Sequence, residues 1–285
     1  MYKKQSPMKM KIFSKEKQGF YSVYKILGIK IKIFSLKRFL KKQTQFFEQT
    51  EKLAQEIINL KTMIRVQTVH SASFAPYQNK HLGQTITLIA SGPSVKQFKP
   101  FIKDSVYVAV NNSCSYDQVD FDYLFLQEQH HDSQKNVIAN KYKGKKCQKF
   151  YGILPENRLK TVYPYIKLIP QGDIKDKTIK RYYLEDKVSH QFASDLITQP
   201  IGDFQGTVFS AMQFIFWTHP KTIYLVGCDC GTGNFTGTMT GDCSVQKDSW
   251  IALKKWAEET YPDVEIISVN PVGLKGLFKD LYQEK

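Results

Sequence analysis

Short apolar runs punctuate the C-terminal two thirds of the chain, and helical patterns separate several of them. The runs cover residues 85–90, 106–110, 123–126, 149–153, 222–227 and 264–269. Runs of this length, rich in β-branched residues, are typical of strands buried on both faces of a sheet. Apolar residues recur at helical spacing over 208–217 and 250–260. This alternation predicts an α/β fold, with a Rossmann-like, mainly parallel sheet and flanking helices.

The first 80 residues follow a different pattern. Ile and Lys alternate over 29–33, which predicts a short strand with one basic face. Apolar and cationic residues mix at helical spacing over 36–42, and apolar residues at three- and four-residue spacing predict a helix over 43–69. Small polar residues and Pro76 predict a linker over 71–80. We therefore expect a basic amphipathic head over 1–42, a helix and linker over 43–80, and the Rossmann-like domain over 81–285.

The charge changes this picture of the first region. The chain carries a net charge of +15, and residues 1–85 hold 17 Lys/Arg against 4 Asp/Glu, whereas residues 86–285 hold 24 against 22. A uniformly basic nucleic-acid-binding domain would not show this asymmetry, so no nucleic-acid partner is expected. The basic segment fits an anionic membrane surface, or it is a solvated arm. The helix after it can pack on the main domain or pair with another copy, so a homo-oligomer is one expectation.

The N-terminus lacks the pattern of a signal peptide, and no apolar run approaches the length of a membrane span. We expect a cytoplasmic protein, attached peripherally at the inner face of a membrane. Five cysteines in an irregular arrangement favour reduced thiols over a metal site, because Cys228 and Cys230 lack the CxxC spacing.

A turn of small residues, Ser91, Gly92, Pro93 and Ser94, follows the first buried strand directly. A glycine at the carboxyl end of a strand lets backbone N–H groups approach a phosphate. The turn is neither GxGxxG nor a Walker A loop, so a standard NAD or ATP site is not indicated. A nucleotide-binding turn is one interpretation, and a purely structural turn is the other.

Other polar residues are expected at the same edge of the sheet. Asn111 and Asn112 end the second strand, where carboxamides bind a base, a ribose or a phosphate, or simply form a turn. Gly206 and Thr207 open a helix, and its N-terminus is a second candidate anion site. Asp229 follows the clearest strand and can hold a hydroxyl of the ligand or a metal.

These motifs together resemble a known group of enzymes. The turn from Ile89 to Ser94, the strand-end Asn112, and Gly206-Thr207 followed by the Gly227-Cys228-Asp229 strand end resemble bacterial CMP-sialic-acid-dependent sialyltransferases. The same turn opens the related MptE-like family, which includes 6-hydroxymethylpterin diphosphokinases. Residues 13–33 also resemble a short head found on bacterial lipopolysaccharide and capsule glycosyltransferases.

The resemblance implies a glycosyltransferase that uses a CMP-activated sugar and a glycan acceptor in bacterial surface glycan biosynthesis, with no metal and no other cofactor. It also implies nucleotide-binding residues: Ser91, Gly92, Pro93, Ser94, Asn111 and Asn112 near the phosphate and ribose, and Gln205, Gly206 and Thr207 near the cytosine.

The chain departs from the sialyltransferases at the catalytic base. Their histidine after the Gly-x-Asp strand has no counterpart here, because residues 230–250 contain no histidine. The remaining candidates for the catalytic groups are His131, Asp242 and Asp229. His131 has an alternative as part of a surface loop. The departure leaves two other functions open, an MptE-like diphosphokinase that uses ATP and magnesium, and a non-catalytic accessory protein of glycan assembly.

Overall fold

The computed structural model describes residues 13–18, 20–26, 29–127, 147–153, 178–184, 191–204, 206–237 and 243–284. The chain forms two compact units, Met1–Thr62 and Met63–Lys285. Within the described residues, no helix combines the length and the apolar character that crossing a bilayer would require.

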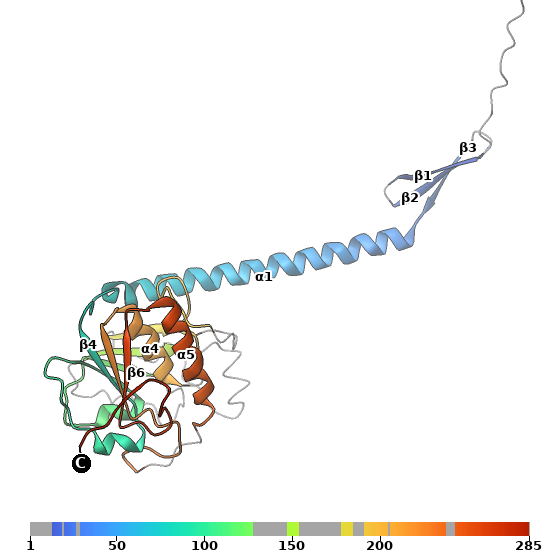
Figure 1. The fold of residues 1–285 in the computed structure, drawn as a ribbon. Coiled ribbons are helices and arrows are strands. Elements are labelled where there is room, and N and C mark those ends of the chain that lie inside the picture. The colour runs from blue at the N-terminus through green and yellow to red at the C-terminus, as the bar shows by residue number, and fades with distance from the viewer. Residues whose placement is uncertain are drawn as a thin grey trace, which may run out of the picture. The chain divides into compact units, whose positions relative to one another are not determined.

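The first unit contains a three-stranded antiparallel sheet and the beginning of a long helix (Figure 1). Its strands are β1 (Phe13–Gln18), β2 (Tyr21–Ile26) and β3 (Ile29–Phe34), and the helix is α1 (Leu36–Phe74). The strand predicted over 29–33 is confirmed as β3, whereas β1 and β2 were not predicted. The ring of Phe39 packs against Phe20 and Phe34, with centroids 5.5 and 5.8 Å apart, and so joins the sheet to the first turn of α1.

Helix α1 is continuous across the boundary that was expected between residues 42 and 43. The physical reason is that the sequence from 36 to 74 contains neither glycine nor proline, and Pro76 is the first residue that breaks a helix. The expected linker over 71–80 is also largely structured. It contains the end of α1 and the 3-10 helix η1 (Ala75–Tyr77), and both Phe74 and Tyr77 are buried in the core.

The second unit is built on an eight-stranded sheet in the order β11-β10-β9-β4-β5-β6-β7-β8, and every neighbouring pair is parallel. The predicted α/β, Rossmann-like fold is therefore confirmed. The strands are β4 (Thr85–Ile89), β5 (Val106–Val110), β6 (Tyr123–Leu126), β7 (Gln148–Ile153), β8 (Ile179–Tyr183), β9 (Thr222–Val226), β10 (Glu265–Val269) and β11 (Lys279–Leu281). Strands β8 and β11 were not predicted, because they are edge strands in which lysine, arginine or aspartate interrupts the apolar pattern.

Two apolar clusters lie on the two faces of this sheet, because successive side chains of a strand point to opposite faces. On one face, Leu88, Val108 and Phe125 pack under α4 (Thr207–Trp217) and α5 (Gln246–Thr260) (Figure 1). On the other face, Ile89, Ala109 and Leu124 pack with residues from the 3-10 helices η2 (Pro93–Gln97) and η3 (Asn111–Ser115). Every residue of α4 is buried, which explains why its sequence is apolar all round.

The last turns of α1 dock on the edge of the sheet in the second unit. The buried His70 accepts a hydrogen bond at Nε2 from the Tyr183 N–H (2.7 Å), and its Nδ1 donates to the Leu196 carbonyl (2.8 Å). The Ser73 hydroxyl donates to the Arg181 carbonyl at 2.6 Å. These bonds attach the end of α1 to β8, so this helix end belongs to the fold of the α/β domain.

Candidate functional site

The strand order places a topological switch point between β4 and β9. From β4 the chain proceeds outward through β5, β6, β7 and β8, and it then returns to the other side of β4 with β9, β10 and β11. The connections that follow β4 and β9 therefore diverge. Open α/β sheets bind ligands outside the carboxyl ends of the strands at such a point. The segments after these two strands are the Ser91–Ser94 turn and Gly227–Cys230, the two that the sequence singled out.

These two segments are tied together by hydrogen bonds. The Gly92 N–H donates to the Gly227 carbonyl at 2.8 Å. The carboxylate of Asp229 accepts two more bonds, from the Ser94 N–H at 2.7 Å and from the Ser94 hydroxyl at 2.5 Å. Ser94 and Asp229 are both buried, with exposed fractions of 5% and 8%. A buried carboxylate needs such partners, so Asp229 acts here as the residue that fixes the turn after β4.

Both glycines at this junction are required by close packing. A Cβ on Gly92 would lie 2.4 Å from the Gly227 carbonyl oxygen and 2.6 Å from Cγ of Asp229. Gly227 has φ +70°, and a Cβ there would lie 2.3 Å from Val95 Cγ2. Glycine is therefore the residue that allows the two backbones to meet.

This packing shows how the groups of the turn are used within the protein. Gly92 and Ser94 were expected near a phosphate, and the N–H groups of both donate to acceptors within the protein. The Ser94 hydroxyl is likewise committed to Asp229. Pro93 begins η2, where its fixed φ suits the first helical position. Of the turn residues, Ser91 has no side-chain hydrogen bond to another described residue and is half-buried, so its hydroxyl is the group best placed to meet a ligand.

Asn111 connects three elements at the same edge. It has a left-handed backbone with φ +46°, which asparagine tolerates better than most residues. Its Nδ2 donates to the Thr207 hydroxyl at the start of α4 (3.0 Å), and its Oδ1 accepts from the Gln127 N–H after β6 (3.4 Å). The carboxyl ends of β5 and β6 are thus attached to the amino end of α4.

The strand register brings the segments of Ser91 and Asn111 to the same edge of the sheet. Ile89 pairs with Ala109, and Ser91 and Asn111 each follow two positions later, just beyond the ends of β4 and β5. Asn112 follows in η3, is half-buried, and forms no side-chain hydrogen bond with another described residue. Ser91 and Asn112 therefore present polar side chains at the edge that Asn111 organises.

The amino end of α4 completes the polar edge. Gly206 is the N-cap, with an extended backbone at φ −170°, and its carbonyl accepts a bond from the Phe209 N–H. A Cβ on Gly206 would lie 2.7 Å from the flexible end of the Gln246 side chain and 3.6 Å from the Phe209 ring. The first N–H groups of a helix carry a partial positive charge, which favours an anion there. The Gln213 carboxamide holds α4 in place, because it bonds to the Ala193 N–H and to both the N–H and the carbonyl of Gly202.

The glycine- and threonine-rich loop after β9 folds back over the turn. The Phe235 N–H donates to the Ser91 carbonyl at 2.9 Å, and the Phe235 ring contacts Tyr116. Near this loop, burial raises the pKa of Cys230 to about 11 and raises that of Cys228 well above its ordinary value. Both thiols therefore stay protonated near neutral pH and are poor nucleophiles.

Three of the predicted site residues lie outside the described residues. These are His131 and Asp242, the candidate bases, and Gln205, which was expected near the cytosine. The structure brings the other predicted residues to one edge, where five of them form two hydrogen-bonded groups. One group is Gly92, Ser94 and Asp229, and the other is Asn111 with Thr207.

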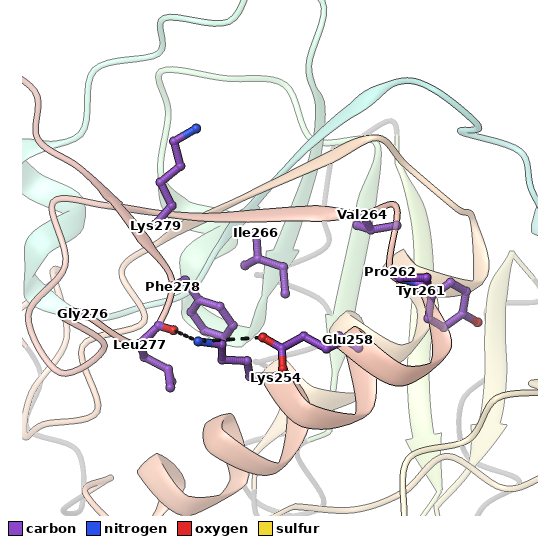
Figure 2. Close-up of a pocket in the computed structure, with 11 residues that line it drawn as sticks. Lys254, Glu258, Tyr261, Pro262, Val264, Ile266, Gly276, Leu277, Phe278 and Lys279 are labelled. Carbon is purple, nitrogen blue, oxygen red and sulfur yellow. Dashed lines mark hydrogen bonds and ion pairs between the residues drawn. The ribbon is translucent and has the colours of Figure 1, made fainter.

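A hollow on the molecule lies away from this edge (Figure 2). It is lined by residues of α5, the start of β10 and the turn before β11, including Lys254, Glu258, Tyr261 and Lys279. The Lys254 ammonium donates to the Leu277 carbonyl at 2.8 Å and lies 3.9 Å from Glu258. None of its lining residues belongs to the polar edge, and the start of a parallel strand is the end opposite to the one where such sheets bind ligands.

Some contacts of the edge were not predicted from the sequence. Asp229 and its partner Ser94 are 135 positions apart in the sequence, and Asn111 and its partner Thr207 are 96 positions apart. The only sequence signal was that each residue follows a buried strand. Which of these residues share a bond depends on the order of the strands, and short motifs do not contain that order.

Comparisons with known proteins assign the chain to no family. No family model matches the chain, and no curated protein matches it in sequence. Among solved structures, the chain is similar to the MAf glycosyltransferase from Magnetospirillum magneticum AMB-1, with 13% identity and a TM-score of 0.45. The match covers 77% of this chain and 38% of that one, so the chain spans well under half the length of this structural neighbour.

Proposed function

We propose that this chain binds a nucleotide-activated sugar at the polar edge of its sheet and transfers the glycosyl group to an acceptor hydroxyl. The observation that carries the proposal is the convergence at the switch point. Ser91, Asn112 and the amino end of α4 lie at the carboxyl ends of neighbouring parallel strands. The Asp229–Ser94 bonds hold the Ser91–Ser94 turn in place. The phosphate of a departing nucleotide suits the donors offered there.

The chemistry follows from the residue types at this edge. The acceptor hydroxyl attacks the anomeric carbon, the bond from that carbon to the nucleotide phosphate breaks, and the proton of the hydroxyl passes to a base. Donors at the α4 amino end stabilise the charge on the departing phosphate, which is the main catalytic contribution we assign to the fold. We propose His131 or Asp242 as the base, and we assign Asp229 a positioning role.

The donor is proposed to be a CMP-sugar, such as CMP-sialic acid, in the synthesis of a bacterial surface glycan. This finer assignment rests on the resemblance of the Ile89–Ser94 turn and the Gly227-Cys228-Asp229 strand end to the sialyltransferases.

A ligand panel tests the proposal. Purified chain is titrated with CMP, UDP, GDP, and ATP with or without magnesium, by calorimetry and thermal shift. We expect saturable binding of CMP without magnesium, followed by CMP release from CMP-sialic acid when a lipooligosaccharide acceptor is added. Binding of ATP alone, and only with magnesium, would replace glycosyl transfer by diphosphate transfer. If no nucleotide binds, nucleotide-dependent chemistry at this edge is excluded.

We also propose that the first unit attaches the protein to an anionic membrane surface at the inner face of the membrane. Within its sheet, Ile31 pairs with Tyr24, which pairs with Lys15, and Ile33 pairs with Ser22, which pairs with Lys17. Directly paired residues share a face of a sheet. Ile31 and Ile33 are 43% and 53% exposed. One face thus combines exposed apolar side chains with two lysines, as a surface that enters the headgroup region requires.

A further inference from the structure

Helix α1 carries a stripe of exposed apolar side chains with a period of seven residues. Phe46, Leu53 and Leu60 are spaced by seven, and so are Ile57 and Ile64, with the polar Thr50 seven residues before Ile57. The two series alternate at intervals of four and three residues. With Thr50, Ile57 and Ile64 at heptad position a, Phe46, Leu53 and Leu60 occupy position d. Gln43 occupies the preceding position a.

These side chains are exposed in the described part of the chain. The exposed fractions are 65% for Phe46, 57% for Leu53, 46% for Ile57, 57% for Leu60 and 57% for Ile64. Isolated exposed apolar residues are ordinary, but a contiguous stripe marks an interaction surface.

The second unit does not use this side of α1 for its own packing. There the buried residues of the helix are Val66, His70, Ser73 and Phe74. At about 100° per residue, Val66 is roughly 200° around the helix from Ile64. Val66 and Ile64 therefore lie on nearly opposite sides of the helix.

We infer that the stripe is covered by α1 of a second copy of this chain, in a parallel two-stranded coiled coil. Helices that pair in this way repeat their apolar residues every 3.5 positions, and a strict seven-residue repeat over three or more heptads indicates a coiled coil. β-branched residues at a with leucine at d favour two parallel strands, and the sequence has Ile57 and Ile64 at a with Leu53 and Leu60 at d. The polar Gln43 and Thr50 at a are of the kind that fixes register.

The flanking charges support the parallel orientation. Glu56 occupies position g and Lys61 the following position e, so in a parallel, in-register pair each Glu56 faces the Lys61 of the other copy. The alternative occupant, an anionic membrane surface, is disfavoured along this stretch. Residues 46–64 hold three glutamates and two lysines, whereas a helix lying on anionic lipid is rich in lysine and arginine.

The first test is the mass of the full chain by size-exclusion chromatography with light scattering. We expect twice the chain mass of 33.0 kDa for the wild type, and 33.0 kDa for the Leu53→Glu/Leu60→Glu variant. The matched control is Gln45→Glu/Asn59→Glu, which adds the same charges on another side of α1 and keeps the dimer mass. Circular dichroism shows whether each variant remains helical. A monomeric or trimeric wild type overturns the inference, and so does a folded Leu53→Glu/Leu60→Glu variant with the dimer mass.

The orientation has its own test. Thr50→Cys at position a forms an intermolecular disulfide under mild oxidation only if the two helices are parallel and in register, because the two sulfurs must come within bonding distance. Gln55→Cys, on the outer side of the helix, is the control that does not cross-link. The Glu56→Lys variant weakens the dimer, and Lys61→Glu added to it restores the dimer. Failure of both the cross-link and the restoration refutes the parallel arrangement. If the wild type is a monomer that sediments with anionic vesicles, and the Leu53→Glu/Leu60→Glu variant no longer sediments with them, the occupant of the stripe is a membrane instead.

Discussion

The carboxylate of Asp229 accepts hydrogen bonds from both the main-chain N–H and the hydroxyl of Ser94, 135 positions earlier in the chain. These bonds connect the segments that leave β4 and β9, the two strands at the switch point of the sheet. The shape of the proposed nucleotide site depends on this pair, since it fixes the Ser91–Ser94 turn.

The pair predicts a measurable coupling. Asp229→Asn removes the charge and presents an N–H₂ group toward the Ser94 donors, so we expect it to lower the free energy of unfolding by about 2–3 kcal/mol. Ser94→Ala removes one of the two bonds and is expected to cost about 1–2 kcal/mol. Urea unfolding of both single variants and the double variant gives their coupling energy, which we expect to be about 1 kcal/mol or more. The half-buried Asp280→Asn, combined with Ser94→Ala, is the control. If the coupling energy between Asp229 and Ser94 is no larger than that between Asp280 and Ser94, the structural role of the pair is contradicted.

Gly92 is predicted to tolerate no side chain. In Gly92→Ala the new methyl group would meet the Gly227 carbonyl at 2.4 Å and Asp229 at 2.6 Å, so the turn must shift. We expect a loss of about 1–3 kcal/mol in the free energy of unfolding. Gly231→Ala is the control in the same region, because its Cβ would have nothing closer than 3.9 Å. Similar urea midpoints for the two variants would argue against the close approach at Gly92.

Substitutions of the neighbouring Asn111 and Asn112 are predicted to have different effects on stability and on nucleotide binding. The Asn111 side chain bonds to Thr207 and Gln127, so Asn111→Ala should lower both the stability and the affinity for nucleotide. Asn112 forms no side-chain hydrogen bond within the described residues. Asn112→Ala should therefore leave the melting temperature unchanged while weakening nucleotide binding about tenfold, the equivalent of one hydrogen bond of about 1.4 kcal/mol.

Calorimetry and thermal shift measure the two effects separately. Gln78→Ala, which removes a carboxamide at the opposite edge of the sheet, should change neither affinity nor stability. Unchanged affinity in Asn112→Ala would remove this residue from the proposed site.

The buried His70 predicts a dependence of stability on pH. Burial lowers the pKa of His70 from 6.5 to about 4, while its two hydrogen bonds hold the neutral ring. Between pH 6.5 and 4 the unfolded chain binds a proton at this residue and the folded chain does not. The free energy of unfolding therefore falls as the pH drops through this range, by at most about 3 kcal/mol from this residue, and its contribution is complete above pH 6.5.

His70→Gln isolates this contribution, because a glutamine can donate to the Leu196 carbonyl and accept from the Tyr183 N–H without titrating. The difference in unfolding free energy between wild type and variant should shrink as the pH falls from 6.5 toward 4. A constant difference would show that the protonation of His70 is not coupled to folding.

The sheet of the first unit predicts a face-specific effect on membrane binding. Lys15→Glu/Lys17→Glu changes the face that carries Ile31 and Ile33, and should release the chain from anionic vesicles in a sedimentation assay. Lys30→Glu/Lys32→Glu makes the same change of charge on the other face, where Val23 is 3% exposed while Tyr21 and Phe34 are 44% and 47% exposed. We expect it to release less protein, because it leaves the face of Ile31 and Ile33 unchanged. Equal losses would indicate attraction by total charge, and no loss in either variant would refute peripheral attachment.

The sequence by itself determined the local structure of the domain and the positions of its candidate groups. β5 and β6 have the predicted bounds, and α4 begins one residue earlier than predicted, because buried strands and a fully buried helix leave nearly continuous apolar runs. The strand β3 was also predicted, from the alternation of isoleucine and lysine.

The tertiary structure alone decided which of these groups meet and which remain available to a ligand. Asp229 reaches Ser94 because β9 inserts beside β4, and that strand order depends on packing across the whole sheet. For the same reason the Gly92 and Ser94 N–H groups, which resemble a phosphate cradle in the sequence, are used inside the fold. The sequence does not show whether the acceptor of a backbone N–H will be a ligand or a distant carbonyl. The acceptor is determined in the folded chain, where every buried polar group needs a hydrogen-bond partner.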